Sequence, residues 1–438
     1  MARFGRIIVG LVAIVIVVGI GFWAWASEPA IDPVSRPAAG QFSKASIAKG
    51  AELAALGNCQ ACHTRPNGKA YAGGYPVETP FGTIYGSNIT PDPDTGIGKW
   101  SEAAFRRSMH EGLRRDGGHL YPAFPYTHFT KVSDADIKDI YAFLMTRPAV
   151  HNTVPSPDLP FPLDIRMVMA GWNLLFFHEG RYQPDGSQNA AWNHGAYIAE
   201  GLGHCAACHV PMNMFGAEKT DKGYAGGNAA GWHAPALDKS SPSPVGWTKD
   251  ELAGYLRGDM TPHHGVAAGP MADVTKVLAE VPHADVEALS TYILSKGATK
   301  PADARKAAIA DAGKKSFQVT TAQKANFKGS AKDGEAIFAG ACASCHFDGG
   351  SQPFYRPVDL SLSSAVNAPN ATNLVQIITH GVKPAAGGSG PIMPGFGDVL
   401  TDDQTASLVG YVRKHFTGKP AWDHVDKAIS TSKETAGQ

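Results

Sequence analysis

The sequence carries little charge and few cysteines. Charged residues make up 18% of the 438 residues and the formal net charge is zero, so the charge does not favour nucleic-acid binding. All six cysteines lie in three copies of one pentapeptide. No cysteine therefore remains for a disulfide, a thiolate nucleophile or an iron–sulfur cluster. The copies are Cys59-Gln-Ala-Cys62-His63, Cys205-Ala-Ala-Cys208-His209 and Cys342-Ala-Ser-Cys345-His346.

The C-x-x-C-H pentapeptide is the attachment site of a c-type haem. Its two cysteines form thioether bonds with the porphyrin, and its histidine becomes the proximal iron ligand. Three copies predict three covalently bound haems c, and hence an electron carrier that is not catalytic alone. The predicted attachment residues are Cys59, Cys62, Cys205, Cys208, Cys342 and Cys345, and the predicted proximal ligands are His63, His209 and His346.

The N-terminal segment is typical of a membrane anchor. Two arginines precede an uncharged, mostly apolar stretch from Ile7 to Ser27, and about 20 apolar residues are enough to cross a bilayer as a helix. Trp23 and Trp25 stand where interfacial aromatic residues are common, and the arginines place the N-terminus in the cytoplasm. We predict one span over residues 7–26 in the inner (cytoplasmic) membrane, with the bulk of the chain in the periplasm.

A cleaved signal peptide is the competing interpretation, because Ala24-Trp25-Ala26 fits the small-x-small cleavage pattern. The apolar run exceeds the ~7–15 residues usual in a signal peptide, and the bulky cluster from Phe22 to Trp25 crowds the cleavage position. These features favour an uncleaved anchor. Either interpretation predicts export from the cytoplasm.

Length and internal repetition divide the chain into three similar parts. In each part a helix leads into the C-x-x-C-H motif, and a long loop and a closing helix follow. The predicted fold is mainly α, with three tandem cytochrome c-type domains after one N-terminal transmembrane helix. The predicted boundaries are 1–27 for the anchor, 28–150 for domain 1, 151–188 for a connector, 189–299 for domain 2, 300–328 for a second connector, 329–417 for domain 3 and 418–438 for a polar tail.

Helix signals support this division. The predicted helices cover 43–56, 101–115, 133–145, 190–202, 283–296 and 331–340, and two more begin at 248 and 401. The first two domains also share the tetrapeptide Tyr-Ala-Gly-Gly, at 71–74 and 224–227. Residue pairs with capping-box spacing are Ser133 with Asp136, Thr248 with Glu251 and Thr401 with Gln404.

The two connectors and the tail differ in character. Residues 167–177 are strongly apolar, and we expect a helix packed between the first two domains, with contact to a membrane or partner as the alternative. Residues 300–328 are rich in Ala and Lys and weakly patterned, which predicts an exposed connector. The polar tail is expected to be loosely held.

A low-spin haem iron needs a second axial ligand, usually from a loop shortly before the closing helix. Methionine at this place raises the reduction potential, whereas a second histidine generally lowers it. In the third domain the prolines that flank Met393 predict a rigid ligand loop. In the second domain Met271 occupies the comparable place, and Met260, His263 and His264 are its competitors.

The first domain breaks this pattern. Phe124 lies 61 residues after His63, whereas Met271 lies 62 residues after His209, and a benzyl side chain cannot bind iron. We favour His128, in the same loop, as the ligand. The other candidates are Met109, Met145, His119 and an open coordination site.

Four stretches, together with the three haem motifs, carry a resemblance to a known family. They are Thr79–Gly98, Leu120–Tyr126, Gly269–Asp273 and Met393–Phe396. In them the chain is similar to the three-haem cytochrome c subunits of membrane-bound bacterial dehydrogenases, and the likeness covers nearly all of the chain after the anchor. The resemblance implies an electron-transfer subunit that carries electrons from a catalytic dehydrogenase subunit to membrane ubiquinone.

Two departures narrow the resemblance. The branch that serves quinone-dependent (PQQ) alcohol dehydrogenase typically has Met at the place of Phe124 and a cleavable signal. An anchor combined with the stretch Tyr121–His128 resembles more the branch of molybdopterin-dependent aldehyde, isoquinoline or nicotinate-type dehydrogenases. This implies an aldehyde-oxidising partner and a small [2Fe–2S] subunit.

Three alternatives stay open. The partner can instead be a PQQ alcohol dehydrogenase or a flavin-dependent sugar or gluconate dehydrogenase. The chain can also be a tethered shuttle that passes electrons to a terminal oxidase. A haem enzyme such as a peroxidase is the third alternative, and it requires an open iron site in the first domain.

Overall fold

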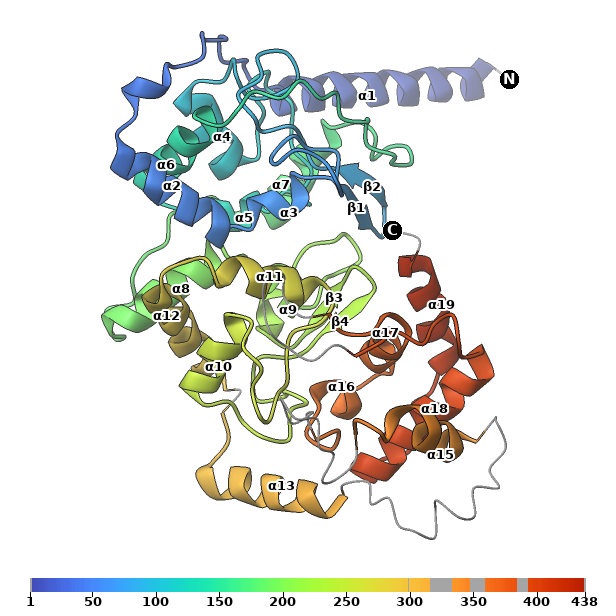
Figure 1. Ribbon diagram of the computed structural model, residues 1–438. Helices are drawn as coiled ribbons and strands as arrows, with labels where there is room; N and C mark the ends of the chain where they lie inside the picture. Colours follow the sequence, from blue (N-terminus) through green and yellow to red (C-terminus); the bar gives the residue numbers. More distant parts are fainter. Residues whose placement is uncertain (1, 298, 316–332, 347–358, 384–392, 437–438) are drawn as a thin grey trace. The chain divides into compact units, whose positions relative to one another are not determined.

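The computed structural model describes residues 2–297, 299–315, 333–346, 359–383 and 393–436 (Figure 1). The chain divides into two compact units. The first comprises Met1–Gln183 with Glu200–His204, and the second comprises Pro184–Ala199 with Cys205–Gln438. The first unit holds the first haem motif, and the second unit holds the other two.

The first unit is mainly helical and contains one small hairpin. Its elements are α1 (Ala2–Ala26), η1 (Ala39–Gln41), α2 (Lys44–Leu56), α3 (Cys59–Cys62), β1 (Pro76–Thr79), β2 (Gly82–Tyr85), α4 (Glu102–Glu111), α5 (Tyr126–Phe129), α6 (Asp134–Met145) and α7 (Val168–Phe176).

The second unit is also mainly helical, and it begins with α8 (Ala190–Glu200), whose last residue falls in the first unit. The other elements are α9 (Ala206–His209), η2 (Thr220–Lys222), β3 (Gly227–Ala229), β4 (Trp232–Ala234), α10 (Lys249–Leu256), α11 (Pro270–Leu278), α12 (His283–Leu294), α13 (Ala302–Lys315), α15 (Gly334–Ile337), η3 (Phe338–Cys342), α16 (Ser364–Asn367), α17 (Thr372–His380), α18 (Asp402–Thr417) and α19 (Val425–Ala436).

One helix crossing recurs in all three predicted domains. The helix before each haem motif meets the helix that closes the domain: α2 meets α6, α8 meets α12, and α15 meets α18. Each crossing passes over a glycine, because only a missing side chain lets the two backbones approach so closely. A Cβ at Gly50, Gly195 or Gly334 would overlap the carbonyl oxygen of Asp139, Ala288 or Ser407, respectively.

The capping signals mark real helix starts. Thr248 with Glu251 and Thr401 with Gln404 form complete capping boxes at α10 and α18. The hydroxyl of Ser133 accepts a hydrogen bond from the backbone N–H of Asp136 at the start of α6. The helix predicted over 101–115 is shorter, Glu102–Glu111, because Gly112 takes a φ of 67° and ends it.

Two antiparallel hairpins stand at equivalent places after the first two motifs, and the sequence pattern did not predict them. In β1–β2, Thr79 pairs with Gly82, and in β3–β4, Ala229 pairs with Trp232. The strands are three or four residues long, which is too short for an alternating pattern to be recognised.

The second connector and the C-terminal tail each contain a helix that buries at least one side chain. In the second connector, α13 buries Ala312 against Val245 and Leu362. In the tail, α19 buries Ile429 and Ser432, and it packs on α17. The expectation of a loose tail was therefore wrong for its described part, whereas most described residues of the connector are exposed, as expected. Each helix has only a narrow apolar face, and its largely polar composition makes this face hard to recognise in the sequence.

The N-terminal helix α1 is 25 residues long, and its described apolar side chains, such as Ile14, Val17 and Ile20, are exposed. Its last residue, Ala26, is buried, and the carbonyl oxygen of Ala26 accepts a hydrogen bond from Nε2 of His119 (2.9 Å). In the described part of the chain, no helix combines the length and the apolar character needed to cross a membrane.

The apolar connector helix α7 packs on its own unit. It buries Met169 and Ala170, and Oδ1 of Asn173 accepts a hydrogen bond from the hydroxyl of Tyr126 (2.5 Å). Leu174, on the same helix, is exposed. Packing of this helix against the second domain stays a prediction.

A hydrogen-bonded turn around Asp92 organises the long loop of the first unit. Oδ1 of Asp92 accepts hydrogen bonds from the backbone N–H groups of Asp94 (3.2 Å) and Thr95 (2.7 Å) and from the Thr95 hydroxyl (2.7 Å). The hydrogen bond from the Thr95 backbone is the main reason why the pKa of Asp92 lies below its ordinary value.

Gly50→Ala tests the helix crossing. The added Cβ overlaps the backbone of α6, so we expect the first unit to lose about 1–3 kcal/mol of unfolding free energy, as overpacked cores do. Gly171→Ala in α7 is the matched control, because nothing lies within 4 Å of a Cβ there, and helix propensity predicts a gain of up to about 1 kcal/mol. Urea unfolding measures both, and equal effects would contradict the crossing.

Asp92→Ala should destabilise the first unit by about 1–2 kcal/mol at neutral pH, because three donors lose their acceptor. Asp92→Asn keeps an acceptor and should lose less. Since the pKa of Asp92 is lowered on folding, its carboxylate stabilises the fold above the ordinary Asp pKa, and this contribution disappears as the pH falls through the lowered value. Urea midpoints across the acid range should therefore vary less with pH in Asp92→Asn than in the wild type.

Candidate haem sites

The first haem motif begins a short helix directly after α2. In α3 the backbone N–H of His63 donates to the carbonyl oxygen of Cys59 (3.1 Å). One helical turn therefore carries Cys59, Cys62 and His63. Side chains three apart lie on the same face of a helix, so both sulfur atoms are presented together with the imidazole.

The first two proximal histidines are oriented in the same way. Nδ1 of His63 donates a hydrogen bond to the carbonyl oxygen of Ser87 (2.6 Å), and Nδ1 of His209 donates one to that of Pro235 (2.7 Å). A proton held on Nδ1 leaves the lone pair of Nε2 available for iron. Burial lowers the pKa of both imidazoles, so the neutral form that can bind a metal is favoured.

The repeated tetrapeptide Tyr-Ala-Gly-Gly supports the proximal side. The backbone N–H of Gly73 donates to the carbonyl oxygen of His63 (2.8 Å), and that of Gly226 donates to His209 (2.9 Å). Both glycines have positive φ, 76° and 89°, which only glycine adopts without strain. Sequence reasoning found the repeat but not this role.

The third motif follows the same plan. The backbone N–H of His346 donates to the carbonyl oxygen of Cys342 (3.0 Å) at the end of η3. Burial lowers the pKa of His346. Its Nδ1 is buried without a hydrogen-bond partner among the described residues, and the segment 347–358 that follows lies outside them.

Three of the motif cysteines have a raised thiol pKa. Burial raises the pKa of the Cys59 thiol to about 12 and that of Cys342 to about 11, and it also raises that of Cys62. A reactive dithiol needs a lowered pKa. The raised pKa values favour the neutral thiol at Cys59, Cys62 and Cys342, and thiols next to a neutral imidazole fit a covalently attached haem.

Met271 lies at the start of α11, half-buried, after Gly269 with a φ of 56°. Two of its competitors have other contacts. Nδ1 of His263 lies 2.8 Å from Oε1 of Glu251, and the His264 ring stacks on Trp247 with centroids 3.5 Å apart. These contacts favour Met271, whose ligand role stays a prediction.

Met393 lies on a short backbone bridge. The N–H of Val382 donates to the carbonyl oxygen of Met393 (2.9 Å), and the N–H of Met393 donates back to Val382 (3.0 Å). The Met393 side chain packs against the core of the third domain. Pro391 lies outside the described residues, and the ligand role of Met393 is likewise a prediction.

The segment that replaces a methionine loop in the first domain has a different arrangement. Phe124 packs against Phe129, with ring centroids 5.2 Å apart. Nδ1 of His128 donates to the carbonyl oxygen of Glu200 (3.0 Å), and the His128 ring lies 6.5 Å from that of His204. This hydrogen bond orients the imidazole of His128 as in the proximal histidines, and the ligand role of His128 stays a prediction.

The other candidates for the first haem are held elsewhere. Met109 and Met145 are buried in the apolar core on α4 and α6, where methionine is a common filler. His119 binds the carbonyl oxygen of Ala26 through Nε2.

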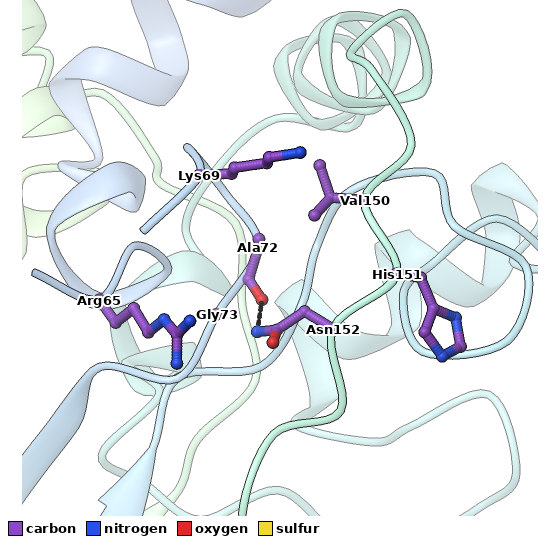
Figure 2. Close-up of a pocket in the computed structure, with 7 residues that line it drawn as sticks. All are labelled: Arg65, Lys69, Ala72, Gly73, Val150, His151 and Asn152. Carbon is purple, nitrogen blue, oxygen red and sulfur yellow. Dashed lines mark hydrogen bonds between the residues drawn. The ribbon is translucent and has the colours of Figure 1, made fainter. Parts of the chain in front are cut away.

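A small cavity of about 190 Å³ lies beside the first motif (Figure 2). Arg65 and Lys69 make its lining basic, Nδ2 of Asn152 donates to the carbonyl oxygen of Ala72 (2.7 Å), and His151 turns towards Asp92 at 3.5 Å. The cavity is smaller than the ~300–1,000 Å³ typical of small-molecule sites, so we assign it no ligand.

Two family models match separate parts of the chain. Residues 47–148 match the family described as cytochrome c. Residues 329–412 match the family described as cytochrome c oxidase, cbb3-type, subunit III. The first match covers the first haem motif, and the second match covers the third.

Known relatives match the chain over most of its length. It is 45% identical over 401 residues to a nicotinate dehydrogenase subunit of Pseudomonas putida. The aligned region covers 91% of this chain but 32% of that protein. The chain thus spans about a third of that relative. It is 34% identical to the fructose dehydrogenase cytochrome subunit of Gluconobacter japonicus over 93% of this chain and 85% of the relative. It is also 34% identical to the gluconate 2-dehydrogenase cytochrome c subunit of Pantoea cypripedii over 90% of each. The chain therefore belongs to the family of cytochrome c subunits of dehydrogenases.

Proposed function

We propose that this chain carries three haems c and conducts electrons from a periplasmic dehydrogenase to membrane ubiquinone. The observation that carries the proposal is the repetition of one scaffold: a glycine-mediated helix crossing next to a C-x-x-C-H motif occurs three times. Each copy supplies two attachment cysteines and a proximal histidine. The proposed sixth ligands are His128, Met271 and Met393.

The protein's own residues hold and orient the iron ligands. A bound haem supplies an iron that takes up and releases one electron. Hydrogen bonds to Ser87 and Pro235 keep the first two proximal histidines in the tautomer that exposes Nε2. Proposed thioether ligation by Met271 and Met393 raises the potential of their sites, and proposed ligation by His128 lowers that of the first.

The proposed partner is an aldehyde-oxidising molybdopterin dehydrogenase with a small [2Fe–2S] subunit. The anchor-plus-His128 pattern supports this branch, as does the higher identity to a nicotinate dehydrogenase subunit (45%) than to the fructose and gluconate relatives (34%). The family match equally admits the second candidate, a PQQ alcohol or flavin-dependent sugar dehydrogenase.

We also propose that residues 7–26 anchor the chain in the inner membrane, with the rest in the periplasm. Their uncharged apolar sequence and the exposure of the described apolar side chains of α1 support this. An anchor keeps the haem domains at the surface of the bilayer in which ubiquinone is dissolved.

Replacing each proposed methionine ligand tests the ligand set. Met271→His and Met393→His should each lower one midpoint potential by on the order of 100 mV, part of the ~0.8 V range that axial ligands control. Met214→His is the matched control, because Met214 is 80% exposed and should leave all potentials unchanged. Potentiometric titration followed by optical spectra measures this, and an unshifted Met271→His titration would disprove that ligand.

Purification of the complex from membranes tests the electron path. We expect a catalytic dehydrogenase subunit to co-purify and the complex to reduce a soluble ubiquinone analogue with its substrate. The reduced protein should not bind carbon monoxide, because all three irons are proposed to be six-coordinate. A full haem complement without quinone reduction would refute the quinone step, and carbon monoxide binding would instead favour a haem enzyme.

A further inference from the structure

The β3–β4 hairpin contacts the second haem site on both sides. On the proximal side, the carbonyl oxygen of Pro235, directly after β4, accepts the hydrogen bond from Nδ1 of His209. On the other side, the indole of Trp232 lies where a Cβ on Gly269 would be, two residues before Met271. Movement of this hairpin therefore displaces both proposed ligands of the second haem.

The same hairpin is bound by two side-chain amides from α17 of the third domain, which lies beside it (Figure 1). Oδ1 of Asn373 accepts from the N–H of His233 (2.9 Å), and Nδ2 of Asn373 donates to the carbonyl oxygen of His233 (2.8 Å). Nε2 of Gln376 donates to the carbonyl oxygen of Gly231 (2.9 Å). Gln376 is fully buried, and the hydroxyl of Ser432 donates to its Oε1 (3.2 Å), so this side chain is held from two elements.

The far end of α17 holds the proposed ligand segment of the third haem. The helix ends at His380, and Val382 then exchanges two backbone hydrogen bonds with Met393. The N–H of Phe396 also donates to the carbonyl oxygen of Ile378 in α17 (2.8 Å). One helix therefore joins the hairpin of the second site to the methionine segment of the third.

The hairpin of the first unit has a different partner. Its hairpin position equivalent to His233 is Thr83, which exchanges two backbone hydrogen bonds with Asp158 of the same unit (3.0 and 2.9 Å). Asn373 makes the same pair of bonds with its side chain, from the third predicted domain but within the same compact unit as the hairpin. The backbone pair between Thr83 and Asp158 is enough to satisfy an exposed strand edge. The pair between His233 and Asn373 does the same and also links two proposed haem sites.

We infer that Asn373 and Gln376 are positioning residues that couple the ligand segments of the second and third haems into one rigid assembly. This rests on the proposed function, in which Met271 and Met393 are iron ligands. A disturbance at either site is then felt at both, because coupling between two sites is reciprocal. This assembly holds the second and third proposed haem sites, between which electrons are proposed to pass, in a fixed relative position.

Asn373→Ala in the purified complex tests this inference. We expect the midpoint potentials of the second and third haems to shift together, each by at least about 28 mV, which is a threefold change in the reduction equilibrium at ~59 mV per tenfold for one electron. Met271→His and Met393→His assign the two titration waves. Asn228→Ala, the same substitution at an exposed hairpin position, is the matched control and should shift neither.

Trp232→Leu supplies the reciprocal measurement. Trp232 contacts the Met271 side, yet the coupling predicts a shift at the third haem as well. Gln376→Leu, which keeps the apolar packing of a buried residue, is the second α17 variant and should also shift both waves. Shifts confined to the haem on the mutated side, or no shifts in a folded protein, would overturn the inference.

Haem content separates this inference from the proposed function. A haem count below three in the wild type would refute the proposed function, whatever the variants do. Three haems with independent potentials would refute the coupling alone. Circular dichroism and the far-red absorption band of methionine-ligated ferric haem show whether each variant is folded and keeps its ligands.

Discussion

The hydrogen bond from a candidate proximal histidine to a backbone carbonyl is the interaction on which the first two candidate haem sites depend. It leaves Nε2 free for iron and sets the plane of the ring. The acceptor comes from Ser87 for His63 and from Pro235 for His209, at the far end of a hairpin in each case. The motif, the glycine turn and the hairpin must therefore fold together before the ligand is in place.

The hairpins also show how one element serves two purposes. Both have a strand edge that needs partners for its backbone groups. The first hairpin is closed by Asp158 from the same unit, whereas the second is closed by Asn373 from the third domain. The second arrangement replaces a backbone segment with one amide side chain, and it thereby joins the second and third predicted domains within one compact unit.

Sequence reasoning succeeded where a local pattern has a direct physical meaning. Ser133, Thr248 and Thr401 were recognised as caps because a side-chain oxygen at that place satisfies an N–H group at the helix end. It failed for the hairpins and for α19, because strands of three or four residues and a mostly polar helix leave no clear periodicity. The roles of Ser87 and Pro235 were invisible, since a backbone carbonyl has no signature in the sequence.

The sequence by itself determined the predicted covalent chemistry: six candidate attachment cysteines and three candidate proximal histidines follow from a pentapeptide whose function is local. The three glycine-mediated helix crossings accompany the three copies of the C-x-x-C-H motif in the sequence. The similarity to a cytochrome subunit of a dehydrogenase agrees with these motifs. Only the tertiary structure decided which carbonyls orient His63 and His209 and that Asn373 and Gln376 bind the second hairpin. The first contacts form only when the loop and hairpin of a domain fold back on its motif, and those of Asn373 and Gln376 join residues about 140 positions apart in the chain.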